Sequence, residues 1–400
     1  MRTLMKVPLT KICIIFVSMG LLAVLLSEMM VYLNIVNSGF ISGPQKTLVF
    51  AWILFWSLIE LMQNFGILNK AYTAFFMFTL VTLCSTAVGV TQDISIPRQM
   101  IHITVFFSAF TAFYIGTKEI GKETPIRLVK FLYLIMALVY IYGKLVNRND
   151  DSSANTIYYV LMFLPINTFI ETKAIKNASY IFQILAVLQS NKRTALIAIL
   201  AYFILIELQI NRNIGSQRLA LKIIAYCVGL TAIWMLFPYV TSLLNVTVFD
   251  ELSLGAVQHD GGSNRLYIYN QLWNAQKNRG LFHWIIGDGY NSVLMSKICT
   301  DGLNGANVSA HDDFLEVLYD YGLVGIALYG LFFCQLFKTG IKYSKGVSCR
   351  ISFFCSIVMV LIISITSHLI IYLNYYTIVF VFWGICLAEF DKKRFLLFEK

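Results

Sequence analysis

Residues 12–33, ICIIFVSMGLLAVLLSEMMVYL, form an apolar run of 22 positions whose one charged side chain is Glu28. About 20 apolar residues cross the hydrocarbon core of a bilayer as a helix, so this run is long enough to span a membrane. The basic start of the chain would also suit a signal peptide, but no small-residue cleavage site follows the run. We therefore interpret residues 12–33 as the first transmembrane helix.

The composition and eleven further apolar runs indicate a protein that crosses the bilayer many times. Hydrophobic residues make up 58% of the 400 residues and charged residues 13%, with a mean hydropathy of +0.71. A soluble domain carries about 25% charged residues, so a soluble globule is excluded. Helices are expected because backbone groups without partners are costly in hydrocarbon. We expect an all-α polytopic membrane protein with twelve spans, over residues 12–33, 47–67, 71–91, 99–117, 126–146, 156–171, 177–191, 194–210, 219–240, 312–337, 352–373 and 375–390.

The distribution of lysine and arginine between these spans predicts the topology. With the N-terminus inside, 21 of these residues lie on the inner side and ten on the outer side. Four of the ten belong to one long loop, where the positive-inside rule has little force. We therefore expect both termini in the cytoplasm and an even number of spans.

The basic residues do not indicate nucleic-acid binding, and the cysteines do not indicate a disulfide-bonded or zinc-binding protein. The net charge of +10 comes from short basic clusters between apolar runs, which is not the pattern of a nucleic-acid-binding surface. The eight cysteines include no C-x-x-C pair, and all but Cys299 lie in or beside apolar runs. Neither a disulfide framework nor a zinc site is therefore expected.

One polar segment, residues 241–311, interrupts the succession of short connections. It divides the chain into spans one to nine (1–240), an outer loop (241–311) and spans ten to twelve (312–400). A loop of this length is typically functional or disordered. It holds glycine-rich patches at 260–262 and 287–289, and an amphipathic helix on the membrane surface is expected from the helical spacing of Leu266, Tyr269, Leu272, Trp273 and Gln276.

Two arginines on the outer side are candidates for binding an anionic substrate. Arg193 follows Lys192 in the tight turn NKRTALIA, where two positive charges oppose the topology rule. Arg265 begins the expected loop helix in SNRLYIYNQLW. An interfacial anchor and a solvated surface residue are the alternative interpretations, but the fixed fork of arginine donors suits the oxygens of a diphosphate.

His311 stands at the outer start of the tenth span, in SAHDDFLEVLYDYGLVG. At 100° per residue it shares one helix face with Leu315, Leu318, Gly322 and Gly325, and the two glycines would let another helix pack closely. An imidazole there could accept a proton near neutral pH. The adjacent Asp312 and Asp313 suit the positive end of a helix and make only a weak metal motif.

Ionisable residues in or near the apolar runs leave a different function open. Glu28, Glu60 and His368 could form the proton path of a proton-coupled transporter or flippase. Glu207 and His102 lie near span ends and are expected to reach the interface. Transporters of this kind are often built from internal repeats with interrupted helices, and neither is visible here.

Three segments in order, NKRTALIAIL, then SNRLYIYNQLW with IIGDGYNS, then AHDDFLEVLYDYGLVG, resemble the O-antigen ligase and polymerase superfamily of bacterial envelope-polysaccharide synthesis. The resemblance covers about residues 190–330, and Asp312 departs from it, since the family often has Asn after the histidine. It implies a glycosyltransferase that uses undecaprenyl-diphosphate-linked oligosaccharide at the periplasmic face of the bacterial inner membrane. No cofactor or metal would be required, and a chain-length regulator and a flippase of the same pathway are the implied partners.

In this interpretation Arg193 and Arg265 bind the diphosphate and His311 is the general base, with Lys192, Asp312 and Glu316 in supporting positions. The stretch from His311 onward is more similar to polymerase members, which extend a chain by the next lipid-linked repeat unit. A ligase, which moves the finished chain to lipid A-core or another acceptor, remains the alternative.

Overall fold

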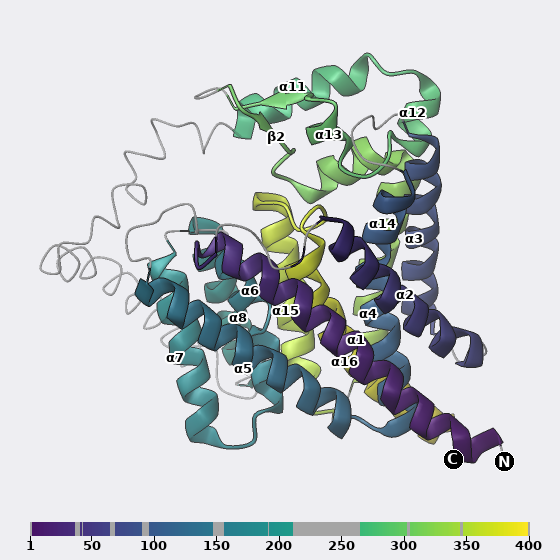
Figure 1. Ribbon diagram of the computed structural model, residues 1–400, viewed down its shortest axis with the longest axis vertical. Coiled ribbons are helices and arrows are strands. Elements are labelled where there is room, and N and C mark those ends of the chain that lie inside the picture. The colour runs from purple at the N-terminus through teal and green to yellow at the C-terminus, as the bar shows by residue number, and fades with distance from the viewer. Residues whose placement is uncertain are drawn as a thin grey trace, which may run out of the picture.

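The computed structural model describes residues 2–36, 41, 43–64, 69–89, 96–146, 156–190, 192–210, 265–301, 305–344 and 347–398. These residues form a bundle of long helices with a small cap at one end (Figure 1). The long helices are α1 (Arg2–Tyr32), α2 (Gly43–Asn64), α3 (Lys70–Val88), α4 (Ile96–Ile120), α5 (Glu123–Val146), α7 (Lys173–Gln189), α8 (Arg193–Ile210), α14 (Asp313–Tyr343), α15 (Arg350–Thr366) and α16 (Leu373–Phe398).

Six of the described helices, α1 to α5 and α14, are long and apolar enough to cross a membrane. The all-α membrane fold is therefore confirmed, and the total of twelve spans stays a prediction. The expected span over 219–240 and the first glycine-rich patch lie outside the described residues. The expected span over 352–373 is too long, because α15 ends at Thr366.

The sixth expected span, 156–171, is wrong as a single helix. It divides into α6 (Ile157–Leu161) and the 3-10 helix η3 (Leu164–Phe169), which has a proline in its first turn. Buried side chains provide hydrogen bonds at this break: Asn167 Nδ2 donates to Gln183 Oε1 at 2.7 Å, and Gln183 Nε2 donates to the Val160 carbonyl at 3.4 Å. Non-helical backbone at membrane depth requires partners of this kind.

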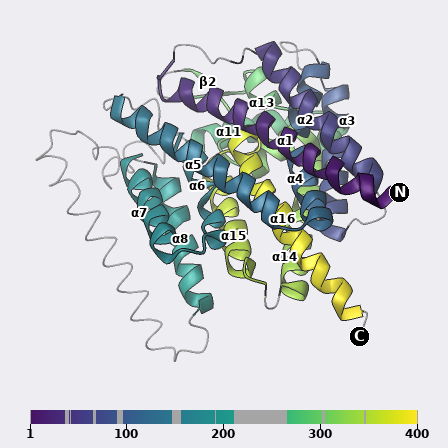
Figure 2. The ribbon, with the colours of Figure 1, turned by 60° about the horizontal axis from the view of Figure 1, so that its bottom comes forward.

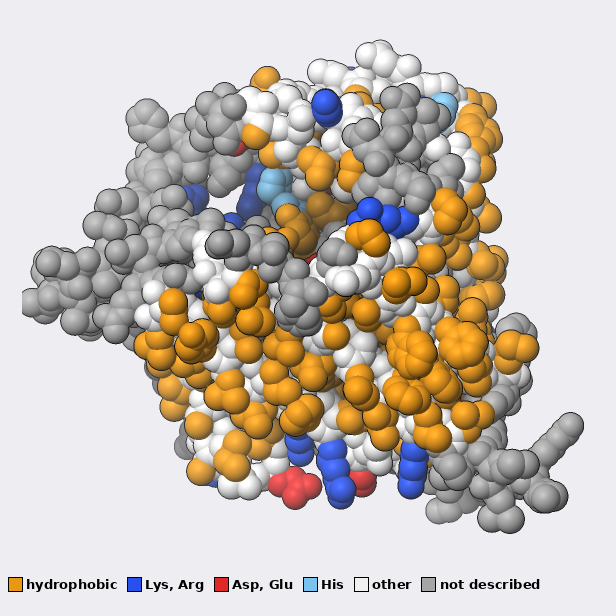
Figure 3. Space-filling view, viewed as in Figure 1, with side chains coloured by type: hydrophobic (Ala, Val, Ile, Leu, Met, Phe, Trp, Pro, Cys, Tyr) orange, Lys and Arg blue, Asp and Glu red, His pale blue; other side chains and the backbone are white. Residues whose placement is uncertain are grey.

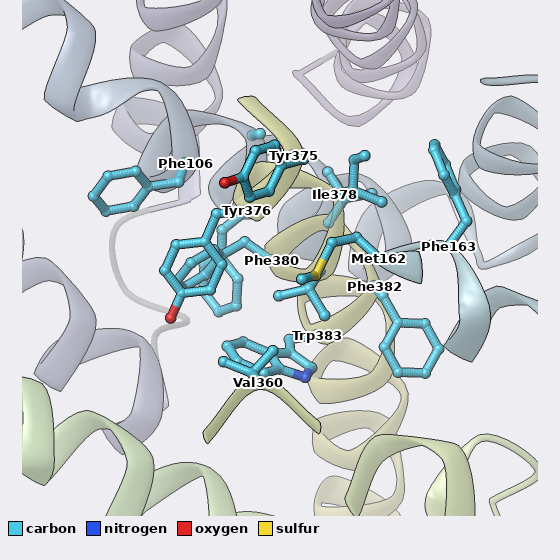
Figure 4. Packing of buried hydrophobic residues seen from close by; sticks show 14 of the residues in the cluster. Phe106, Met162, Phe163, Val360, Tyr375, Tyr376, Ile378, Phe380, Phe382 and Trp383 are labelled. Carbon is cyan, nitrogen blue, oxygen red and sulfur yellow. The ribbon is translucent and has the colours of Figure 1, made fainter. Parts of the chain in front are cut away.

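Aromatic side chains fill the core where α3, α4, α14 and α16 meet. Phe380 stacks on Phe75 at 4.7 Å between ring centroids and lies 5.1 Å from the Trp383 ring (Figure 4). The indole of Trp383 donates to Ser356 Oγ at 2.8 Å, which satisfies its buried N–H. Gly384 allows α16 to approach α4, because a Cβ there would lie 2.9 Å from the Phe110 carbonyl oxygen. Figure 2 shows α7 and α8 side by side at one edge of this bundle.

Both termini lie at the end of the bundle opposite the cap (Figure 1). At that end Asp391 of α16 accepts hydrogen bonds from Tyr114 and from Asn69 Nδ2, the latter at 3.1 Å, and lies 3.5 Å from Lys118 Nζ. Hydrophobic side chains cover a broad band between this charged end and a hollow beneath the cap (Figure 3). This arrangement is what a bilayer-spanning bundle requires.

The cap consists of residues 265–301 and 305–310. It contains α11 (Arg265–Lys277), α12 (Leu281–Ile286), α13 (Ser292–Met295) and a two-stranded antiparallel sheet of β1 (Cys299–Thr300) and β2 (Asn307–Val308). The expected helix that begins at Arg265 is therefore confirmed. Its buried face is Ile268, Leu272 and Gln276, whereas Leu266 and Trp273 are exposed.

The second glycine-rich patch fixes the cap to the bundle. Gly287 and Gly289 have φ values of 84° and 92°, and the Gly289 amide donates to the Asp320 carbonyl of α14 at 2.8 Å. Gly322 allows this approach, since its own φ is 67° and a Cβ there would lie 2.3 Å from the Ile285 carbonyl oxygen. The close packing expected at Gly322 is confirmed, but α14 is kinked there, so the single straight face expected from His311 to Gly325 is wrong.

Candidate active site

Hydrogen bonds on both sides of His311 hold its backbone in an unusual conformation. Its φ is +53°, a region that non-glycine residues rarely adopt. The preceding Ala310 amide donates to Glu316 Oε2 at 2.7 Å, and the Tyr269 hydroxyl donates to the His311 carbonyl at 3.4 Å. Asp312 is the N-cap of α14 and accepts from the Leu315 amide at 2.9 Å. Such conformations persist where surrounding contacts determine them, often at functional sites.

A second histidine lies against His311. The ring centroids of His311 and His368 are 4.4 Å apart. The Nδ1 atom of His368 lies 3.2 Å from Ser309 Oγ, and the His368 ring also stacks on that of Tyr372, with centroids 4.7 Å apart. The apolar run 352–373 predicts a membrane span that includes His368, but α15 ends at Thr366, which places His368 at the site instead.

Asp313 joins the two histidine-bearing segments. Its buried carboxylate accepts from the amides of Leu369 and Ile370, at 2.6 and 2.9 Å, and from Ser364 Oγ at 2.6 Å. All three donors flank His368, while Asp313 is two residues from His311. The sequence predicts for Asp313 only a favourable position at the positive end of a helix. In the structure, its hydrogen bonds hold the segment with His368 next to the segment with His311.

Two cations lie close enough to His311 to control its charge. Burial lowers the pKa of His311 to about 4, with further lowering from Arg265 and then Lys192, while Asp301 acts in the opposite direction. The pKa of His368 is also well below its ordinary value, because of burial, His311, Lys192 and Arg265 in that order. The structure thus brings Lys192, Arg265, His311 and His368 together. Basic and histidine side chains gather in the hollow beneath the cap in Figure 3.

Arg193 follows Lys192 directly and begins α8 with a half-buried side chain. The next residue, Thr194, is buried at the same end of the bundle. A role for Arg193 in binding substrate stays a prediction.

Asp312 and Glu316, the acidic residues expected to support the active site, lie in different surroundings. Asp312 caps α14, as described above. Glu316 is fully buried, with Oε2 bound to the Ala310 amide and no hydrogen-bond partner for Oε1 among the described residues. Within the described ranges, no three His, Cys, Asp or Glu side chains are arranged to hold a metal ion. Metal independence of the reaction remains a prediction.

Glu28 and Glu60, the two carboxylates of the transporter interpretation, both contact side chains of other residues. Glu28 accepts hydrogen bonds from Lys46, from Asn374 and from the Tyr159 hydroxyl, the last at 2.8 Å. It thereby connects α1 with α2, α6 and α16. Glu60 is buried beside the thiol of Cys13 in α1. These positions favour structural roles for both carboxylates.

The fold and this site define an integral membrane protein with cations and histidines gathered at one end of the bundle. Residues 178–330 match the family model described as O-antigen ligase. The match confirms the resemblance to the O-antigen ligase and polymerase superfamily over this region, which contains Lys192, Arg193, Arg265 and His311 but not His368. No match was found among curated proteins.

Proposed function

We propose that this protein is a polysaccharide polymerase of a bacterial inner membrane, acting at the periplasmic end of its helix bundle. It transfers a glycan from undecaprenyl diphosphate to a sugar hydroxyl of the next lipid-linked repeat unit. The observation that carries the proposal is the position of His311, whose ring lies 4.4 Å from the His368 ring between centroids and within the electrostatic influence of Arg265 and Lys192. A chain-length regulator and a flippase would be its partners in the pathway.

The reaction needs a leaving group stabilised on one side and a base on the other. The bond between the anomeric carbon and the diphosphate oxygen breaks, and the hydroxyl oxygen of the acceptor forms the new glycosidic bond. Arg265, with Lys192 and Arg193, would neutralise the charge that develops on the departing diphosphate. His311 would take the proton of the acceptor hydroxyl.

The same cations would couple donor binding to the strength of the base. In the free protein burial, and then Arg265 and Lys192, lower the pKa of His311, which makes the imidazole a weak base. A bound diphosphate brings negative charge that offsets their field, which raises the pKa of His311. The base therefore becomes stronger when the donor is in place.

A ligase is the second candidate, because the matching family model is described as O-antigen ligase. The two reactions share the donor and the chemistry at His311. They differ in the acceptor, which for a ligase is lipid A-core or another molecule that receives the finished chain.

Deletion of the gene followed by complementation distinguishes these candidates. We would size the surface glycan and extract the lipid-linked glycans after complementation with wild type, His311→Ala, Arg265→Ala or Arg193→Ala. Single repeat units on the final acceptor would indicate a polymerase, and long chains retained on undecaprenyl diphosphate would indicate a ligase.

The three variants should lose activity while still accumulating in the membrane. His283→Ala is the matched control, because His283 lies in the same cap but contacts Asp288 at 2.5 Å, away from the site. If neither glycan pool depends on the wild-type gene, the glycosyltransferase proposal is wrong and a transporter becomes the leading candidate.

A further inference from the structure

A second basic cluster lies at the beginnings of α2 and α4, at the same end of the bundle as the candidate active site. It consists of Lys46, Arg98 and His102, with Thr47 Oγ1 3.0 Å from His102 Nε2. Arg98 and Lys46 both act electrostatically on His102, and Arg98 acts on Lys46. Gly43 leaves room for the guanidinium, since a Cβ there would lie 2.5 Å from Arg98 Nη2.

Among the residues that the structure describes, this second cluster carries more positive charge than its neighbours balance. Within the described ranges its ion pair is the one between Lys46 and Glu28, and Glu28 also accepts from Tyr159 and Asn374. The buried Nε of Arg98 has no hydrogen-bond partner among the described residues. Cations on the outer side also oppose the topology rule, as Lys192 and Arg193 do. An anion would complete the cluster.

A continuous row of aromatic rings connects the second cluster with His311. Tyr159, which donates to Glu28, lies 5.2 Å from Tyr375 between ring centroids, and Tyr375 stacks on Tyr372 at 5.4 Å. Tyr372 in turn stacks on His368, which contacts His311. Tyr159 and Tyr375 are fully buried, whereas Tyr372 is half-buried and Tyr32, whose ring centroid lies 6.4 Å from that of Tyr159, is 36% exposed. The accessible rings of this group are therefore Tyr32 and Tyr372.

We propose that Arg98 and Lys46 bind the diphosphate of the acceptor, a second lipid-linked glycan, whose sugars pass over the accessible rings of Tyr32 and Tyr372 toward His311. This inference rests on the proposed function. Arginine forms paired hydrogen bonds with phosphate oxygens, and aromatic rings offer an apolar face with polar edges to a sugar. Basic side chains lie on both sides of the hollow in Figure 3, as two diphosphate sites require.

The acceptor's diphosphate can be tested separately from the donor's. The full-length protein in phosphatidylcholine nanodiscs would receive an undecaprenyl-diphosphate-linked donor and one of two isotopically labelled acceptors. One acceptor carries the lipid diphosphate, and the other is the same glycan without it. The variants are Arg98→Gln, Arg98→Lys and the matched control Lys122→Gln, which removes a cation at the opposite end of the bundle.

Arg98→Gln should raise the KM for the diphosphate-linked acceptor roughly tenfold or more and leave the KM for the free glycan at its wild-type value, because only the former loses a charge-assisted contact. Arg98→Lys should restore part of the loss, and Lys122→Gln should change neither KM. Since Arg98 lacks a carboxylate partner among the described residues, its replacement leaves no acidic group unpaired there.

Equal effects of Arg98→Gln on both acceptors, or no effect on either, would overturn the acceptor site. So would an effect that develops only in nanodiscs with phosphatidylglycerol, because the ligand would then be an anionic phospholipid headgroup. A wild-type protein that elongates neither acceptor overturns the proposed function itself, and the acceptor site with it.

Discussion

Burial is the largest cause of the lowered pKa of His311, and residues far from it in the sequence lower the pKa further. Lys192 precedes α8 and Arg265 begins α11, yet both lower the pKa of this imidazole. A neutral imidazole is the form that can accept a proton, so the activity should fall as the pH decreases through the pKa of His311.

Replacement of Lys192 should therefore change the pH profile as well as the rate. In Lys192→Gln the pKa of His311 rises toward its ordinary value, and the acid limb of kcat/KM moves to higher pH. Most of the depression should persist, because burial is its larger cause. The measurement is kcat/KM against pH for wild type, Lys192→Gln and the exposed-lysine control Lys277→Gln.

An acid limb that stays in place in Lys192→Gln, or shifts equally in Lys277→Gln, would show that His311 is not the base that this limb reports. The acid limb of kcat should also lie above that of kcat/KM, since kcat describes the donor-bound protein, where the diphosphate offsets the cations.

The sequence revealed the residues of the site that stand out chemically from their neighbours. Arg265 and His311 were found because a charged or titratable side chain begins an expected helix on the outer side. The stretch SITSHLII has the composition of an apolar run and therefore predicts a membrane span around His368. Only tertiary contacts, chiefly those of Asp313 with the amides after His368, show that the helix ends before it.

At the scale of the element, the kink of α14 depends on Gly322. Gly322→Ala would place a Cβ against the Ile285 carbonyl and force a residue other than glycine to a φ of 67°. The backbone conformation alone should cost about 1–3 kcal/mol. We expect a lower Tm in detergent and loss of activity, because the cap would shift from the bundle.

Gly330→Ala provides the matched control on the same helix, since nothing lies within 4 Å of the added Cβ. It should be neutral or slightly stabilising, as alanine favours a helix over glycine. Equal Tm values for the two variants would contradict the role assigned to the kink.

The break between α6 and η3 depends on buried amides. Gln183→Leu would leave Asn167 Nδ2 and the Val160 carbonyl without their partner, at a cost of about 1–3 kcal/mol. Asn177→Leu, on the exposed side of α7, is the control and should be close to neutral. Thermal unfolding in detergent compares the two, and a Tm for Gln183→Leu at or above that of the control would contradict the prediction.

Most of the long helices could be predicted from the sequence, because an apolar run of about 20 residues has few alternatives in a bilayer. Helix breaks within these apolar runs could not be predicted in this way. Residues 156–171 remain apolar through the break, and the amides that stabilise it lie partly on α7, so composition along one segment carries no signal of it.

At the scale of the whole molecule, the expected topology places the cap outside and both termini inside. In a background with the exposed Cys84 and Cys334 replaced by serine, Lys277→Cys in the cap should react with a membrane-impermeant maleimide on spheroplasts. Lys70→Cys, at the other end of the bundle, should react only after permeabilisation. The reverse pattern would invert the topology and place the site in the cytoplasm.

The pairing of His311 with His368 has a consequence for how the protein is made. His311 lies within residues 178–330, which match the family model, but its partner comes from the turn between the last two described helices. During synthesis the histidine pair cannot form until that final hairpin has left the ribosome and inserted. A chimera in which only residues 178–330 come from a relative would thus combine one histidine of this protein's pair with a partner from the other protein. A working chimera should exchange the hairpin that carries His368 together with residues 178–330.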